Sequence, residues 1–268
     1  MTVKAQFSLT SSESKRLIGR SVSRHPKVKK ALKSGIVAIG LGSTNAFVVE
    51  EILKKRIEKE RYVAGFIDEK GPCVVPASKR MSEVVLKNGK PVNKKPGEIV
   101  KKMKPTDVFI KGANALDFDG VAGVMMGSET GGTVADVLGI VKARGINLII
   151  PVGLEKLIPY SINDISNATG IFETDYSIGI PVGVMPVAGE VITEVEALEI
   201  LGVNAIVIGS GGIGDGEASK AFQIEGNKRD VTRVVNFIKK IKGDKRVEAL
   251  RGSCKTCVYK HCPDFRKR

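Results

Sequence analysis

Two polar turns rich in small residues are the first candidates for chemistry. One contains Gly40, Gly42, Ser43 and Thr44 and joins a short apolar run to a helical pattern. Such a turn presents backbone N–H groups and hydroxyls at a helix N-terminus, where phosphate and carboxylate groups bind. The same residue types also form ordinary tight connections, so both interpretations stay open. A second turn precedes another predicted helix and supplies the candidate ligand-binding residues Gly127, Ser128, Thr130, Gly131 and Gly132.

A third polar segment supplies candidate catalytic side chains. Lys111, Asn114 and Asp117 follow a short apolar run, and Glu129 or Asp136 would add a second carboxylate. A lysine, an amide and a carboxylate at the carboxyl end of a strand suit oxyanion contact, orientation and proton transfer. The alternative is a simple turn, because Asn and Asp favour such backbone and a lysine is commonly solvated.

The elements that must position these residues alternate between strands and helices. Apolar runs over 36–41, 107–110 and 147–151 read as buried strands, and helical patterns follow the first and precede the last. This order predicts an α/β fold with a Rossmann-like parallel sheet. Ligands of such sheets bind at the carboxyl ends of the strands, so we expect the three polar segments to meet at one edge.

The chain divides into three predicted parts. Residues 1–178 form the Rossmann-like large domain, which begins with a basic helix over 15–33. Residues 179–242 have the order β-α-β-β-α, which predicts a smaller ferredoxin-like α+β lobe. Residues 243–268 form a basic tail that contains cysteines.

The run 209–217 contains the pattern G-x-G-G-x-G after an apolar segment. A dinucleotide fingerprint requires a helix directly after such a turn, whereas residues 218–225 read as a strand. We therefore expect no nicotinamide cofactor. The turn is interpreted as a flexible connection or as a lid over a cleft.

Three cysteines lie within nine residues near the C-terminus. Cys254, Cys257 and Cys262 have the spacing C-x2-C-x4-C, which favours a metal over disulfides in a chain predicted to be cytoplasmic. Zinc needs a fourth ligand, for which His261 and Cys73 are candidates, and an iron–sulfur cluster is the other candidate. Unligated or redox-active thiols remain a further interpretation.

Composition and charge restrict the classes of partner. The chain has 42% hydrophobic residues, which indicates a globular fold, and it has no apolar run of the roughly 18 residues that a membrane span needs. We expect a cytoplasmic protein without a membrane partner, and a homo-oligomer is a candidate state. The net charge of +14 is concentrated in 1–33, 87–104 and 239–268, with net charges of +8, +6 and +8. RNA or an acidic protein is a candidate partner of these basic ends.

The chain resembles type A ribose-5-phosphate isomerase over roughly residues 20–242. The resemblance rests on the run 35–44, the strand end at 111–117, the glycine turn before Thr133 and the segment 181–186. That fold is shared with glucosamine-6-phosphate deaminase and CoA transferases. The resemblance implies a cleft between the two lobes that binds a sugar phosphate or a related anion.

The reactive residues of that isomerase are replaced. Its Asp-Gly-Ala-Asp run corresponds to Lys111-Gly-Ala-Asn114 here, and Met126 and Ala135 stand where it has a lysine and a glutamate. Ribose-5-phosphate isomerase activity itself is therefore not expected. The sequence predicts a protein that binds a phosphorylated or carboxylated small molecule, such as a sugar phosphate, a nucleotide or a CoA-like compound, and that catalyses isomerisation or a related proton transfer. The alternative is a non-catalytic ligand sensor or an RNA- or protein-associated factor with a metal-binding knuckle.

Overall fold

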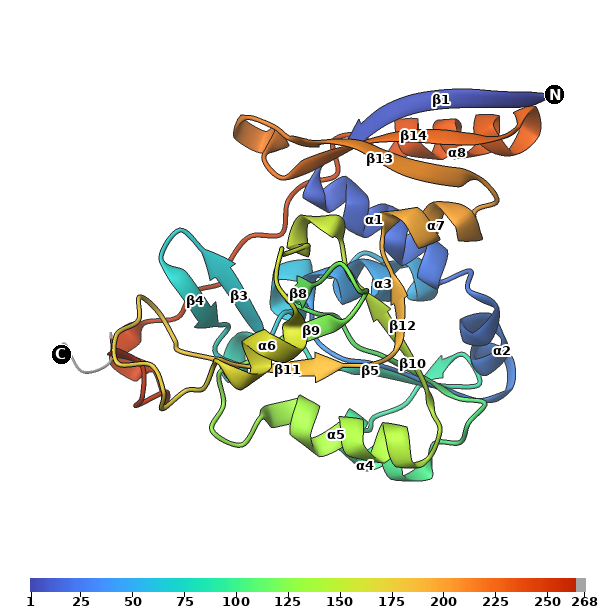
Figure 1. Ribbon diagram of the computed structural model, residues 1–268. Helices are drawn as coiled ribbons and strands as arrows, with labels where there is room; N and C mark the ends of the chain where they lie inside the picture. The colour runs from blue at the N-terminus through green and yellow to red at the C-terminus, as the bar shows by residue number, and fades with distance from the viewer. Residues whose placement is uncertain (264–268) are drawn as a thin grey trace.

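A mixed sheet of six strands forms the centre of the molecule (Figure 1). The computed structural model describes residues 1–263, so the end of the predicted tail lies outside the described residues. Four neighbouring strands are parallel. The fifth is antiparallel to them, and the edge strand beyond it is antiparallel to the fifth and so runs in the same direction as the first four. In spatial order the strands are β12 (Glu190–Ile192), β10 (Asn147–Pro151), β7 (Val108–Ile110), β2 (Ile36–Ile39), β5 (Val84–Lys87) and β6 (Lys90–Pro91). The α/β class is thus confirmed, with a mixed rather than a parallel sheet.

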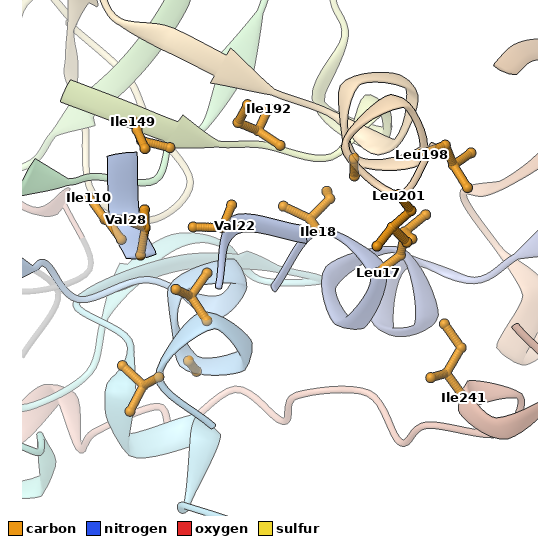
Figure 2. Close-up of a cluster of buried hydrophobic side chains, with 14 of the residues drawn as sticks. Leu17, Ile18, Val22, Val28, Ile110, Ile149, Ile192, Leu198, Leu201 and Ile241 are labelled. Carbon is orange, nitrogen blue, oxygen red and sulfur yellow. The ribbon is translucent and has the colours of Figure 1, made fainter. Parts of the chain in front are cut away.

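The central strands are short and apolar because both faces of the sheet are covered. Ile110 of β7 points into one hydrophobic cluster, whereas its neighbour Phe109 points into a second cluster on the other face. Figure 2 shows Ile110, Ile149 and Ile192 on the side of Ile18 and Val22. The helices of the first face are α1 (Ser11–Val22), α2 (Pro26–Ser34), α3 (Ser43–Leu53) and α7 (Glu194–Ile200). Those of the second face are α4 (Pro96–Ile99) and α5 (Gly132–Ala143).

The N-terminus differs from the predicted basic helix over 15–33. Residues Thr2–Leu9 form strand β1, and the helical region is divided into α1 and α2 at His25-Pro26. Pro26 starts α2 at a position where its missing N–H costs no helical hydrogen bond. Thr10 begins α1 with a capping box, in which its side chain accepts from Glu13 N and the Glu13 carboxylate accepts from Thr10 N.

Strand β1 belongs to a second, antiparallel sheet, in which it lies beside two strands from the last third of the chain (Figure 1). It pairs with β14 (Ser219–Asn227) from Thr2 opposite Asn227 to Leu9 opposite Lys220, and β14 also pairs with β13 (Asn204–Gly211). The amphipathic helix α8 (Lys228–Ile241) packs on β1 and β14.

The range 179–242, predicted as one lobe, contributes to three sheets. Its first strand, β11 (Gly183–Val187), pairs with β9 (Ala122–Met126). Its second strand, β12, lies in the central sheet, and only the remainder packs with β1. The partner of β14 is the N-terminal strand, which sequence order could not indicate. The other smaller elements are β3 (Gly65–Asp68), β4 (Gly71–Val74), β8 (Ala115–Leu116) and α6 (Ile162–Asn167). Among the described residues, no helix has the length and apolar character needed to cross a bilayer.

Candidate functional site

The three polar segments line one cavity of about 270 Å³. The turn after β2 and the turn after β7 meet there because β2 and β7 are parallel neighbours, with Gly40 N donating to Ile110 O at 2.9 Å. The third turn follows β9, which belongs to the small β8–β9–β11 sheet rather than to the central sheet. The predicted meeting of the segments is therefore confirmed, although their placement at the edge of a single sheet is not. The lining includes all predicted ligand-binding residues except Thr130, namely Gly40, Gly42, Ser43, Thr44, Gly127, Ser128, Gly131 and Gly132.

The N-terminus of α3 opens into this cavity. The N-cap residue is Gly42, which has no side chain to accept from the first N–H groups of the helix. Thr44, in the first turn, is 2% exposed and lines the cavity. Its Oγ1 is buried without a hydrogen-bond partner among residues 1–263. A buried hydroxyl beside open backbone donors is suited to an anionic ligand that supplies the missing acceptor.

The N-terminus of α5 opens into the same cavity. Gly131 and Gly132 have φ values of 72° and 55°, in the left-handed region that favours glycine, and both line the cavity. Gly131 is the N-cap and, like Gly42, has no side chain for capping. Thr130, the missing member of the predicted set, places its hydroxyl 3.2 Å from Ser128 Oγ. Two helix N-termini thus direct positive partial charge toward one volume.

Two lysines add full positive charges to the lining. Lys111 follows β7, and its Nζ donates to Gly112 O at 3.2 Å; Lys156 Nζ donates to Ala113 O at 2.6 Å. Burial and the repulsion of Lys156 lower the pKa of Lys111 to about 8. Burial also lowers the pKa of Lys156. Lys156 is not among the site residues that the sequence predicts, although its place shortly after the buried strand β10 is a usable signal.

Two largely buried carboxylates, those of Glu155 and Glu194, act on Lys156. Glu155 Oε1 is 3.3 Å from Lys15 Nζ, and Glu194 Oε2 accepts from Leu154 N at 2.9 Å. Burial and the charge of Glu155 raise the pKa of Glu194 to about 7. Although burial opposes ionisation of Glu155, Lys15 and Lys156 hold its pKa below the ordinary value. These carboxylates compensate part of the charge of the lysines that face the cavity.

Only some of the predicted catalytic residues line the cavity. Lys111 and Asn114 line the cavity, and Asn114 Oδ1 accepts from Met125 N at 3.1 Å, which holds β9 in place. Asp117 has a structural role instead, because its carboxylate accepts hydrogen bonds from three backbone N–H groups, those of Asp119, Val121 and Ile162.

Two further carboxylates predicted for the site lie outside the described lining. Glu129 Oε1 is 3.4 Å from His261 Nδ1, and Asp136 is exposed on α5. The carboxylate that does line the cavity is Glu83, one residue before β5. No local pattern in the sequence indicates Glu83, because β5 reaches the site through its antiparallel pairing with β2.

The C-terminal segment passes the β3–β4 hairpin (Figure 1), and its residue Tyr259 lines the cavity. The Arg251 guanidinium forms a two-contact ion pair with Asp68, in which Nε lies 3.0 Å from Oδ2, and it also donates to Gly71 O. Tyr259 from this segment and Cys73 from β4 line the cavity. The tail therefore contributes to the site, which the sequence reasoning did not anticipate.

The predicted metal site stays a prediction. Within residues 1–263 no group of three or more His, Cys, Asp or Glu side chains is placed to hold a metal ion. Cys254 is exposed and Cys257 is half-buried, whereas Cys262 is buried. Burial raises the pKa of the Cys73 thiol, which does not favour its thiolate form.

The glycine run 209–217 joins two antiparallel strands. β13 ends at Gly211 and β14 starts at Ser219, so the predicted strand after the run is confirmed. The described cavity lining contains none of these residues. The interpretation of the run as a lid over the cavity remains without support from its position.

Comparison with known proteins assigns no family to the chain. The sequence matches no family model, and no curated protein matches it. The resemblance to ribose-5-phosphate isomerase therefore stays a prediction, and the function must be inferred from the site.

Proposed function

We propose that the protein binds a small phosphorylated or carboxylated molecule in this cavity and catalyses a proton transfer on it. One observation carries the proposal: two helix N-termini, from α3 and α5, and two lysines line the same volume. All four features favour negative charge, and burial strengthens their interaction with an anion because water screens it less. The unpartnered Thr44 hydroxyl supports the same ligand class.

The size of the cavity favours a small metabolite. A volume of about 270 Å³ lies just below the roughly 300–1,000 Å³ of typical ligand pockets. Among the candidate ligands, a sugar phosphate or a short phosphorylated acid fits this volume better than a nucleotide or a CoA compound. The cavity adjoins the carboxyl ends of the parallel neighbours β2 and β7, which supports a Rossmann-like, isomerase-type fold as part of this proposal.

Proton transfer requires a base and a group that stabilises the resulting oxyanion. Glu83 is the carboxylate in the described lining, and Lys111, Lys156 and Arg80 are the cations. In the proposed reaction Glu83 removes a proton from a carbon next to a carbonyl group. A lysine ammonium then stabilises the charge that develops on the carbonyl oxygen.

The proposal is tested by measuring how anions change thermal stability. Ligands that bind only the folded chain raise its melting temperature. Glyceraldehyde 3-phosphate, inorganic phosphate and malonate should do so, whereas uncharged glyceraldehyde should not. Ribose 5-phosphate is expected to bind without being isomerised. If none of these anions raised the melting temperature at millimolar concentration, the proposal would be wrong.

A matched pair of variants tests the location of the site. Thr44→Val removes the buried hydroxyl while keeping the shape of the side chain, and it should weaken phosphate binding by about tenfold or more. Thr106→Val makes the same change at an exposed turn and should leave the affinity unchanged. Equal affinities for the two variants would place the anion elsewhere.

The alternative function is that of a non-catalytic sensor, which would bind the same anion in this cavity but would not convert it. It would be favoured if anions bound tightly while Glu83→Gln changed no reaction rate with any carbonyl substrate in the panel.

A further inference from the structure

Lys111 occupies an unusual position for a lysine. It lies at the carboxyl end of β7, between β10 and β2, and its backbone N donates to Ile149 O at 3.0 Å. Its aliphatic side chain packs closely against Gly40. A Cβ atom added at Gly40 would lie only 3.4 Å from Lys111 Cδ. This packing holds the amine at the cavity wall.

The surroundings of Lys111 contain a cation but no paired carboxylate. In the described chain no carboxylate oxygen lies within ion-pair distance of Lys111 Nζ. The charge that acts on it is that of Lys156, whereas the charges of Glu155 and Glu194 act on Lys156. Desolvation and a neighbouring cation together lower the pKa of Lys111 to about 8, so an appreciable fraction of the amine is neutral near physiological pH. These are the two conditions that make a lysine nucleophilic.

We propose that Lys111 forms a Schiff base with the aldehyde or ketone group of the bound anion. This inference rests on the proposed function, because the cavity must first hold the phosphate or carboxylate end of the molecule. It narrows the substrate class to phosphorylated or carboxylated carbonyl compounds. It also assigns Lys111 a covalent role rather than an electrostatic one.

The step balances without an oxidant or a reductant. The lone pair of Lys111 Nζ attacks the carbonyl carbon and forms a carbinolamine. The C–O bond then breaks, the oxygen leaves as water with the two hydrogens of the amine, and a C=N bond remains. Protonation of this imine acidifies the adjacent C–H, which Glu83 in the same lining would deprotonate.

The test is reductive trapping on the full chain. Glyceraldehyde 3-phosphate and cyanoborohydride are added, and peptide mass spectrometry locates the adduct, with glycerol 3-phosphate as the carbonyl-free control. The expected result is an adduct mainly on Lys111, suppressed at least tenfold by excess inorganic phosphate. Adducts spread over surface lysines and insensitive to phosphate would overturn the proposal.

Variants separate this inference from the proposed function. Lys111→Arg keeps the positive charge, so it should retain phosphate binding but lose the trapped adduct. Lys101→Arg, at an exposed position, should change neither. Phosphate binding without trapping in the parent chain would refute the Schiff base alone, whereas loss of both would refute the proposed function too.

A pH profile tests the positioning role of Lys156. Trapping in the parent chain should be half-maximal near pH 8. Lys156→Gln keeps a donor for Ala113 O but removes the charge, so the midpoint should move to higher pH and trapping at pH 7 should fall severalfold. Arg80 and Glu83, which also line the cavity, are unchanged in this variant. An unchanged midpoint would show that Lys156 does not tune Lys111.

Discussion

Glu194 is the residue at which burial and ionisation conflict most clearly. Its pKa is raised to about 7 by burial and by the charge of Glu155, so the folded chain retains this proton above the pKa of the unfolded chain. Stability from this group is therefore lost as pH rises from about 4.5 to about 7. Glu194→Gln should stabilise the protein little at pH 4.5 and by up to about 3 kcal/mol at pH 8. Urea unfolding at both pH values measures the difference; a pH-independent effect would contradict the raised pKa.

Asp117 illustrates a residue whose chemistry is structural. Its carboxylate accepts from three backbone N–H groups in a buried turn, so Asp117→Asn places an amide hydrogen against at least one of these donors. We expect a loss of about 2 kcal/mol or more in the free energy of unfolding. Phosphate affinity of the folded variant should stay within about twofold of the parent. A large loss of phosphate affinity with an unchanged free energy of unfolding would show instead that Asp117 belongs to the binding site.

At the scale of elements, the start of α1 depends on a single capping residue. Thr10 Oγ1 accepts from Glu13 N at 3.3 Å, and Thr10 N donates to Glu13 Oε2 at 2.9 Å. Thr10→Ala should reduce the free energy of unfolding by about 1 kcal/mol. Ser11→Ala, the adjacent substitution outside the capping box, should cost less. Chemical denaturation of both variants tests this, and equal costs would argue against the cap.

The sequence predicted the central elements but not their partners. The runs 107–110 and 147–151 are strands as expected, because fully buried strands have continuous apolar patterns. Val3, Ala5, Phe7 and Leu9 alternate with polar residues as strand β1 requires, yet their partner β14 lies more than two hundred positions away.

The site residues, too, could be predicted only where they do not depend on pairing between distant segments. Glu83 and Lys156 reach the cavity through the spatial order of strands, which pairing between distant segments determines. The glycine turns could be predicted because each lies next to the helix that it starts. The resemblance to the isomerase group, by contrast, has no support from family comparison.

At the scale of the whole molecule, ion pairs tie the two basic ends to each other and to α3. Arg16 contacts Glu50 and Asp244, and Lys242 contacts Glu13. Part of the positive charge of the two ends is thus neutralised by ion pairs within the fold. This weakens the argument that the basic ends bind RNA. The pair between Arg251 and Asp68 similarly holds the tail on the β3–β4 hairpin beside the cavity.

This attachment is testable by hydrogen exchange. Arg251→Ala removes the contacts to Asp68 and Gly71, so amide exchange in β3 and β4 should accelerate while the β1–β14 pairing keeps its protection. Arg246→Ala removes an ion pair between two exposed side chains and should leave β3 and β4 unaffected. Faster exchange throughout the chain in Arg251→Ala would indicate general destabilisation rather than local release.

The central claim is that an anion binds between the N-termini of α3 and α5, and backbone amide NMR tests it most directly. On titration with inorganic phosphate, the amide signals of Ser43, Thr44, Gly132 and Thr133 should move together and saturate with one dissociation constant. Signals in the basic segment 87–104 should move little. Shifts that are confined to such basic surface segments, or that never saturate, would contradict the account.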